Sequence, residues 1–294
     1  MALQRLFYSR RVRERIEHQV RRVKPSLVFN TQSSLFLTKN PRGRTFNIFY
    51  DPSDLLVMDP KTVSPLTSPY KIPYYWLMRH FIYNPAKVVR ESVSIPLSKQ
   101  LEEKLDELQT PHSKYLYPPT ELCFQPKPKK KQVVQATRIV PHKRLDLFMD
   151  IARKLPEYRF ILAGAENPGY ENYLRKLLSS KPSNVDYVEC RIRDRPELVE
   201  ESKVYLYTSI EPGINITTAQ AVGAGCVPVT PAWGGGAEIV RTVGGYWYHN
   251  LDEAVLMVKS ALEDWTPESA KELSKNAQVF NGEAFEDAIR RIVA

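Results

Sequence analysis

The sequence holds few cysteines and no long apolar run, and each shortage excludes a class of protein. Its three cysteines (Cys123, Cys190 and Cys226) are widely spaced without a C-x-x-C pair, which argues against a disulfide framework or a cysteine zinc site. No run of about 18 apolar residues is present, so no transmembrane helix is expected. The first residues lack the apolar core of a secretion signal. With no H-E-x-x-H motif and scattered histidines, we expect a cytoplasmic protein without a structural metal.

Acidic residues are scarce in two segments of a chain whose net charge is +9. Residues 1–24 contain eight Arg or Lys against two Glu, and residues 127–144 contain seven Arg or Lys and no acid. Basic clusters bind anionic partners, namely nucleic acid, acidic lipid or phosphate ligands. The alternative interpretation is a solvated helix face followed by a charged linker, and at this stage both stay open.

Hydrophobic patterns divide the chain into two halves at the segment P-K-P-K-K-K (residues 126–131), which we interpret as a domain linker. Before it, the patterns predict helices over 1–24, 74–83 and 97–108, strands over 26–30 (buried), 46–50 and 114–117, and a proline-rich loop over 60–73. After it, they predict strands over 132–137, 159–163, 185–189, 203–208, 226–230 and 245–248, and helices over 143–155, 170–178, 196–202, 267–279 and 283–293, with further helices between the last strands.

Regular alternation of apolar strands with helices is typical of an α/β fold with a doubly wound parallel sheet, covered on both faces. We therefore expect a reduced α/β domain over 1–125, a Rossmann-like domain over 126–265, and C-terminal helices over 266–294. The last two helices have no strand after them and are expected to pack back on the first domain.

Charged residues follow two of the predicted strands, where parallel sheets bind their ligands. Arg138 follows the strand over 132–137, and Lys143 is expected at the start of the next helix. Two cations beside a helix N-terminus suit a diphosphate, while a pair of surface cations is the simpler alternative. Glu211 follows the strand over 203–208, where its carboxylate can accept hydrogen bonds from sugar hydroxyls or stabilise a helix start.

Glycines also stand at this predicted edge. Gly164 directly follows the strand over 159–163, and a glycine at this position fits either a nucleotide contact or an ordinary turn. The triplet Gly234, Gly235 and Gly236 opens a predicted helix, and without a Cβ its amides can approach a phosphate closely. Together these strand ends predict one anion-binding pocket.

In order along the chain, these motifs resemble the donor domain of retaining GT-B glycosyltransferases of family 4, the glycosyl transferases group 1 type. The resemblance covers about residues 130–260 and rests on Arg138-x4-Lys143, F-I-L-A-G, S-I-E-P-G, A-V-G-A-G-C-V-P-V and G-G-G-A-E-I-V. It is fainter upstream, in K-P-S-L-V-F-N-T and K-Y-L-Y-P-P-T. It implies two Rossmann-like domains, the first on the acceptor side and the second binding a nucleotide-diphosphate sugar, with no required metal or cofactor.

The same resemblance implies roles for individual residues. Arg138 and Lys143 contact the donor diphosphate, the glycine triplet lies near the phosphates and the sugar, and Glu211 contacts the donor sugar. The second Glu of the family's E-x7-E motif, which holds the ribose, is absent. Its place falls at Ala219 when counted from Glu211, or at Gln220 when counted from A-G-C-V-P-V. Gln220 is then expected to bind the ribose as a neutral and weaker partner.

Three functions compete at this stage. The leading one is a hexosyltransferase-like glycosyltransferase that transfers a sugar with retention. Because the helix over 1–24 is basic and amphipathic, peripheral contact with an anionic inner membrane face and a lipid-linked acceptor are expected with it. The alternative is a non-catalytic nucleotide-sugar-binding or assembly protein, since the second Glu is missing and no glycine-rich loop precedes Lys24. Nucleic-acid binding ranks last, because no recognised motif accompanies the charge.

Overall fold

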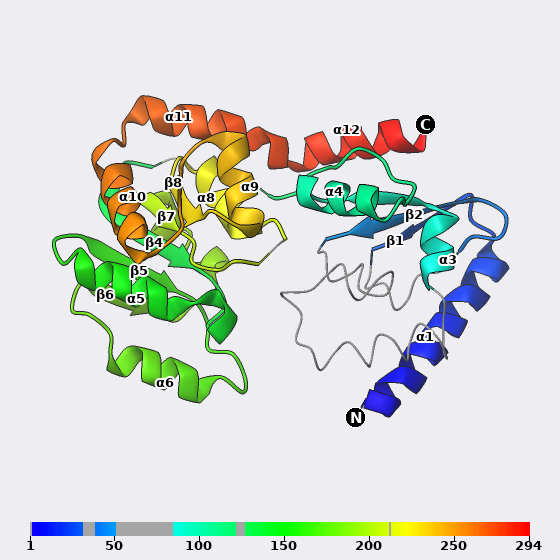
Figure 1. Cartoon of the computed structure of the whole chain (residues 1–294), viewed down its shortest axis with the longest axis horizontal. Coiled ribbons are helices and arrows are strands. Elements are labelled where there is room, and N and C mark those ends of the chain that lie inside the picture. Colours follow the sequence, from blue (N-terminus) through cyan, green and yellow to red (C-terminus); the bar gives the residue numbers. More distant parts are fainter. Residues whose placement is uncertain (1, 32–38, 51–84, 122–126, 212) are drawn as a thin grey trace. The chain divides into compact units, whose positions relative to one another are not determined.

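A computed structural model describes the chain over residues 2–31, 39–50, 85–121, 127–211 and 213–294 (Figure 1). The chain forms two compact units, Met1–Tyr117 and Pro118–Ala294, and each is described by itself. The proline-rich loop and the aromatic helix predicted over 60–73 and 74–83 lie outside the described residues.

The first unit is built on a small parallel sheet in the order β1-β2-β3. Its strands are β1 (Leu27–Asn30), β2 (Arg44–Phe49) and β3 (Val93–Pro96), and its helices are α1 (Ala2–Val23), α3 (Pro85–Arg90) and α4 (Lys99–Glu107). Central β2 is buried over all but its first residue. The predicted helices over 1–24 and 97–108 are confirmed as α1 and α4. None of the described helices combines the length and the apolar character needed to cross a membrane.

Two predictions for the first unit are wrong. The strand over 26–30 was expected to be buried, yet Phe29 in β1 is 38% exposed, because within the described residues β1 pairs with β2 alone. The segment over 114–117 is no strand, although Leu116 donates a backbone hydrogen bond to Pro96 over 2.9 Å. The sequence patterns also missed α3 and β3, which are short.

The second unit contains a six-stranded, fully parallel sheet in the order β6-β5-β4-β7-β8-β9. The strands are β4 (Lys130–Ala136), β5 (Arg159–Ala163), β6 (Val185–Val188), β7 (Ser202–Leu206), β8 (Val227–Pro231) and β9 (Tyr246–Tyr248). The longer helices are α5 (Leu145–Lys154), α6 (Glu171–Ser179), α8 (Ile216–Gly223), α9 (Gly234–Val243), α10 (Leu251–Glu263), α11 (Pro267–Asn276) and α12 (Gly282–Val293). The predicted doubly wound sheet is thereby confirmed. Lys130 and Lys131, expected in the linker, instead begin β4.

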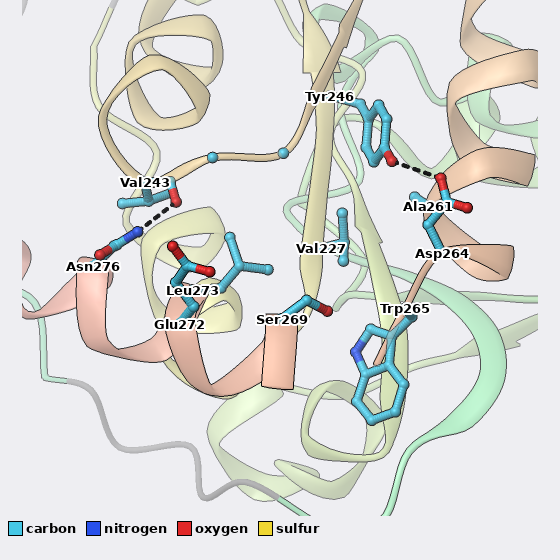
Figure 2. A pocket seen from close by; sticks show the side chains of 12 residues that line it. Val227, Val243, Tyr246, Ala261, Asp264, Trp265, Ser269, Glu272, Leu273 and Asn276 are labelled. Carbon is cyan, nitrogen blue, oxygen red and sulfur yellow. Dashed lines mark hydrogen bonds between the residues drawn. The ribbon is translucent and has the colours of Figure 1, made fainter. Parts of the chain in front are cut away.

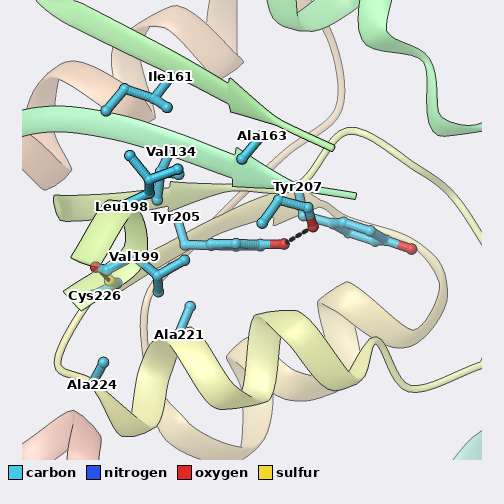
Figure 3. Packing of buried hydrophobic residues seen from close by; sticks show 11 residues of the cluster. Val134, Ile161, Ala163, Leu198, Val199, Tyr205, Tyr207, Ala221, Ala224 and Cys226 are labelled. Atoms are coloured by element: carbon cyan, nitrogen blue, oxygen red, sulfur yellow. Dashed lines mark hydrogen bonds between the residues drawn. The ribbon is translucent and has the colours of Figure 1, made fainter. Parts of the chain in front are cut away.

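Helices cover both faces of this sheet. On one face, α5 and α10 contact each other, and α10 also contacts β7 and β8. On the other face, α7 (Glu197–Glu200) and α8 pack on the strands through a buried cluster (Figure 3). There Tyr205 of β7 donates a hydrogen bond over 2.8 Å to the Ala136 carbonyl at the end of β4. Burial on both faces is why the strands read as continuous apolar runs rather than alternating ones.

The strand order reverses between β4 and β7, which are neighbours in the sheet but far apart in the sequence. Their carboxyl ends lie side by side, and the chain leaves them in opposite directions. Ligands of doubly wound sheets bind in the crevice at such a switch point. The residues that follow Ala136 and Leu206 are therefore the first place to look for a site.

Candidate active site

The switch point brings Lys143 and Glu211 into direct contact. The Lys143 ammonium donates a hydrogen bond to Glu211 Oε2, and His142 Nε2 lies 3.2 Å from Glu211 Oε1. Lys143 is buried, with 5% of its surface exposed, whereas the Glu211 side chain is about one-third exposed. A buried ammonium is costly unless it is paired, so this lysine is held in place by its carboxylate.

The sequence led us to expect Lys143 at the start of a helix, and this prediction is wrong. It ends a 3-10 turn, Pro141–Lys143, and α5 begins two residues later at Leu145. The turn is tied to the end of β7, because Thr208 Oγ1 donates to the Lys143 carbonyl over 2.6 Å and Ser209 Oγ to the His142 carbonyl over 3.1 Å. Lys143 is therefore positioned by the residues that follow the neighbouring strand β7.

Arg144, which joins the turn to α5, adopts the left-handed conformation with φ 52° and ψ 48°. This region costs a residue with a Cβ about 1–2 kcal/mol, a penalty that glycine avoids. Glycine also raises the entropy of the unfolded chain, which offsets part of that gain. We expect Arg144→Gly to raise the free energy of unfolding by about 0.5–1 kcal/mol, measured by urea denaturation. A lower free energy than in the wild type would contradict the strain argument.

Opposing effects set the charge of Glu211 and His142. Burial by itself raises the pKa of Glu211, but the hydrogen bond and charge of Lys143, with the charges of His142 and Arg138, outweigh it and lower this pKa. Burial lowers the pKa of His142, and the charges of Lys143 and Arg138 lower it further against the opposing effect of Glu211. At neutral pH the site therefore holds an ionised carboxylate, an ammonium and a neutral imidazole.

The lowered pKa of Glu211 makes stability depend on pH in a definite direction. The folded state holds the ionised form, so its stabilising contribution is complete above the ordinary pKa of 4.5 and is lost as the pH falls below it. We expect Glu211→Gln to reduce the slope of unfolding free energy against pH in this acidic range. The measurement is urea denaturation at a series of pH values; parallel curves for the two proteins would rule out this contribution.

A pocket with a cavity volume of about 290 Å³ opens beside this cluster, at the same edge of the sheet. It is lined by the loops that follow β4, β5 and β6, including Arg138, Gly164, Glu166 and Cys190, and by Thr217 in the first turn of α8. Arg138 links the pocket to the cluster, since its charge also acts on Glu211 and His142. Gly164 keeps the pocket's wall compact, because a Cβ there would lie 2.1 Å from the Thr137 carbonyl oxygen.

The glycine triplet opens α9, as predicted, but the chain's own backbone occupies the space above it. Gly234 has φ +71°, and a Cβ there would lie 2.3 Å from the Glu211 carbonyl oxygen. The amide of Gly235 donates to that same carbonyl over 2.9 Å, so it is not offered to a phosphate. A Cβ at Gly236 would meet the Tyr207 ring at 2.9 Å. The triplet thus fixes the loop that carries Glu211 against α9.

Gln220 lies apart from the pocket lining. It belongs to α8, and its Nε2 donates over 2.9 Å to the Glu121 carbonyl. Ala219, the other position for the family's second Glu, is fully buried. The residue of this helix that reaches the pocket is Thr217. A ribose contact by Gln220 stays a prediction.

Sequence reasoning missed His142, Tyr207 and Thr217. Tyr207 is buried, its hydroxyl lies 3.4 Å from Glu211 Oε2, and its ring centroid lies 5.8 Å from the Lys143 ammonium. His142 directly precedes Lys143, so its closeness to a site lysine was a usable signal. No pattern pointed to Tyr207, which reads as an ordinary strand residue. Among the described residues, no group of His, Cys, Asp and Glu could hold a metal ion.

A second pocket lies at the opposite edge of the sheet, with a cavity volume of about 400 Å³ (Figure 2). Val227 and Tyr246, the first residues of β8 and β9, line it together with the acids Asp264 and Glu272. The Tyr246 hydroxyl donates to Asp264 over 3.0 Å. No Lys or Arg is among the described residues that line it, so this pocket does not suit a diphosphate.

Comparisons with known proteins agree with this fold. The family model described as glycosyl transferases group 1 matches residues 124–280, more than half of the chain. HepE of Anabaena, solved with UDP, aligns with a TM-score of 0.73 and 15% identity over 96% of this chain and 81% of that chain. Sucrose-phosphate synthase of Thermosynechococcus elongatus aligns with a TM-score of 0.74 and 14% identity over 96% of this chain and 76% of that chain. The pneumococcal O-GlcNAc transferase GtfA, solved with UDP and GlcNAc, aligns with a TM-score of 0.65 and 13% identity over 95% of this chain and 59% of that chain. Comparison with curated proteins gave no match.

Proposed function

Because the chain belongs to the glycosyl transferases group 1 family, we propose that it transfers a sugar from a UDP-sugar to an acceptor with retention of configuration. The choice of uridine is supported by HepE and GtfA, whose structures contain UDP. Retention is supported by the resemblance of the motifs around Arg138, Lys143 and Glu211 to those of retaining GT-B glycosyltransferases.

One observation carries the proposal: the buried Lys143 ammonium lies against Glu211 at the switch point of the sheet. An ammonium has three donors, and among the described residues Glu211 is bonded to one of them, so two are open to diphosphate oxygens. Negative charge grows on the leaving diphosphate as the sugar bond breaks, and fixed cations in a partly dry site stabilise it. Lys143 and Arg138 supply that charge, while Glu211 accepts a hydrogen bond from a hydroxyl of the donor sugar.

The test is calorimetric titration with UDP, UDP-glucose and the matching GDP- and ADP-sugars, followed by an NMR assay of transfer to sugar and lipid acceptors. We expect UDP compounds to bind at least tenfold more tightly than the others, a difference of about 1.4 kcal/mol. We also expect the product to keep the donor's anomeric configuration. Equal affinity for the UDP-, GDP- and ADP-sugars would contradict the assignment of uridine. A product with inverted anomeric configuration would contradict retention.

A second function remains in competition, a non-catalytic nucleotide-sugar-binding or assembly protein. It is favoured by the residues at the ribose position, since Ala219 is buried and Gln220 is bonded to Glu121. The same experiment separates the two functions. Binding of UDP-sugars with neither transfer nor hydrolysis across the acceptor panel would favour the non-catalytic protein.

A peripheral contact with the inner membrane face and a lipid-linked acceptor belong to this proposal. They are supported by α1, which has no acid in its first turn and ends with Arg21 and Arg22. Basic amphipathic helices bind anionic lipid surfaces, and salt screens that attraction. We expect the protein to sediment with anionic liposomes at low salt and to be released at about 0.5 M NaCl, where the screening length is short. Equal sedimentation with neutral liposomes would remove the membrane contact.

A further inference from the structure

The two oxygens of the Glu211 carboxylate are held by different partners. Oε2 accepts from the Lys143 ammonium and, over 3.4 Å, from the Tyr207 hydroxyl. Oε1 lies 3.2 Å from His142 Nε2. Because each oxygen is held from its own side, the plane of the carboxylate is fixed. Without His142, only the Lys143 side would remain to orient it.

His142 can do this because its own backbone is immobilised. It is the middle residue of the 3-10 turn that begins at Pro141, whose ring limits φ. Its carbonyl accepts from Ser209 Oγ over 3.1 Å, and the next carbonyl accepts from Thr208 Oγ1. Thr208 is in turn bonded to Gln135 of β4 over 2.9 Å. The backbone that carries the imidazole is thus supported by residues of β4 and of the segment after β7, while the His142 side chain itself is 48% exposed.

The groups that face His142 decide what kind of partner it is. They are Glu211 after β7, and Arg138 and Lys143 on its own loop. Burial and the two cations lower the pKa of His142 from its ordinary value of 6.5, although Glu211 opposes them. The ring is therefore neutral at pH 7, with its Nε2 lying 3.2 Å from Glu211 Oε1. A neutral imidazole 3.2 Å from Oε1 limits the rotation of the carboxylate and leaves its charge for the substrate, whereas an imidazolium would form a second ion pair with it.

We propose that His142 is a positioning residue that holds the Glu211 carboxylate in the orientation required by the donor sugar, and that protonation of His142 withdraws Glu211 from this role. The inference rests on the proposed function of the same site. It assigns to His142 an effect on turnover, and it predicts that acid inactivates the enzyme through this histidine before Glu211 itself is protonated.

The kinetic test compares wild type with His142→Ala and His142→Gln. We expect His142→Ala to lower kcat about tenfold, or about 1.4 kcal/mol, because the carboxylate loses its neighbour on the Oε1 side, with UDP affinity changed less than threefold. Glutamine can donate from a similar place and does not titrate, so His142→Gln should recover most of the loss. In the pH profile of kcat/KM for His142→Gln, the acidic limb should move to lower pH. Wild-type kcat in His142→Ala, or an unmoved limb in His142→Gln, would overturn the inference.

The matched control is His112→Ala, which removes another histidine–carboxylate contact, 3.0 Å from His112 Nε2 to Asp106, in the first unit. It should change neither kcat nor the acidic limb. A second measurement needs no substrate: NMR titration of the His142 ring in wild type and in Glu211→Gln. Because Glu211 raises the pKa of His142, its loss should lower that pKa, and an unchanged value would refute the contact. Absence of transfer by the wild type would count against the proposed function alone.

Discussion

Lys143→Ala is expected to weaken UDP binding at least tenfold, about 1.4 kcal/mol, and to reduce sugar transfer by at least as much. The lysine is the most buried cation of the site and is already oriented by Glu211. A preorganised charge contributes more in such surroundings than in water, because no solvent has to reorganise when the diphosphate leaves. Binding is measured by calorimetric titration and transfer by product formation.

Two further variants make that result interpretable. Lys143→Met keeps most of the side chain's volume and should lose the same affinity, which separates the charge from the packing. Lys154→Ala removes an exposed lysine that pairs with Asp252 over 3.0 Å, and it should bind UDP as the wild type does. Thermal unfolding shows whether each variant is folded. Unchanged affinity in folded Lys143→Ala would mean that the phosphates bind elsewhere.

Gly235→Ala is expected to destabilise the second unit by about 3 kcal/mol or more, near the upper end of what overpacking costs. A Cβ at this position would lie 2.0 Å from the Gly213 carbonyl oxygen and 2.8 Å from the Ile214 amide nitrogen. Both obstacles are backbone atoms, so no side-chain rotation relieves them. The loop carrying Glu211 would have to move away from α9, breaking the hydrogen bond from the Gly235 amide to the Glu211 carbonyl.

The measurement is calorimetric unfolding, where a loss of this size lowers Tm by about 6–12 °C in a domain of this length. Gly282→Ala is the matched control, because a Cβ at Gly282 meets nothing within 4 Å at the start of α12. It should leave Tm within about a degree or raise it slightly, since alanine reduces the entropy of the unfolded chain. Equal Tm values for the two variants would show that the backbone contact at Gly235 has no energetic weight. Activity should fall in Gly235→Ala alone.

Local patterns predicted most of the second unit's elements because the physical cause of each pattern is itself local. Apolar runs such as 159–163 and 203–208 correspond to strands that are covered on both faces. The patterns failed where a residue's environment comes from elsewhere. Phe29 is apolar yet 38% exposed, because β1 has one described neighbour, and Arg144 takes a left-handed conformation that its side chain does not favour. Short α3 and β3 contain too few residues to show a period.

By itself, the sequence determined which residues end the strands and which of them carry charge, so Arg138, Lys143 and Glu211 were identifiable as one group. Only the tertiary structure decided how they meet. Strand order depends on hydrogen bonds between segments distant in sequence. Because β4 and β7 are neighbours in the sheet, Lys143 contacts Glu211, which lies 68 residues later in the sequence. The same neighbourhood adds His142 and Tyr207, and it turns the glycine triplet toward the chain's own backbone. These are consequences of packing, because they arise from contacts that no local pattern contains.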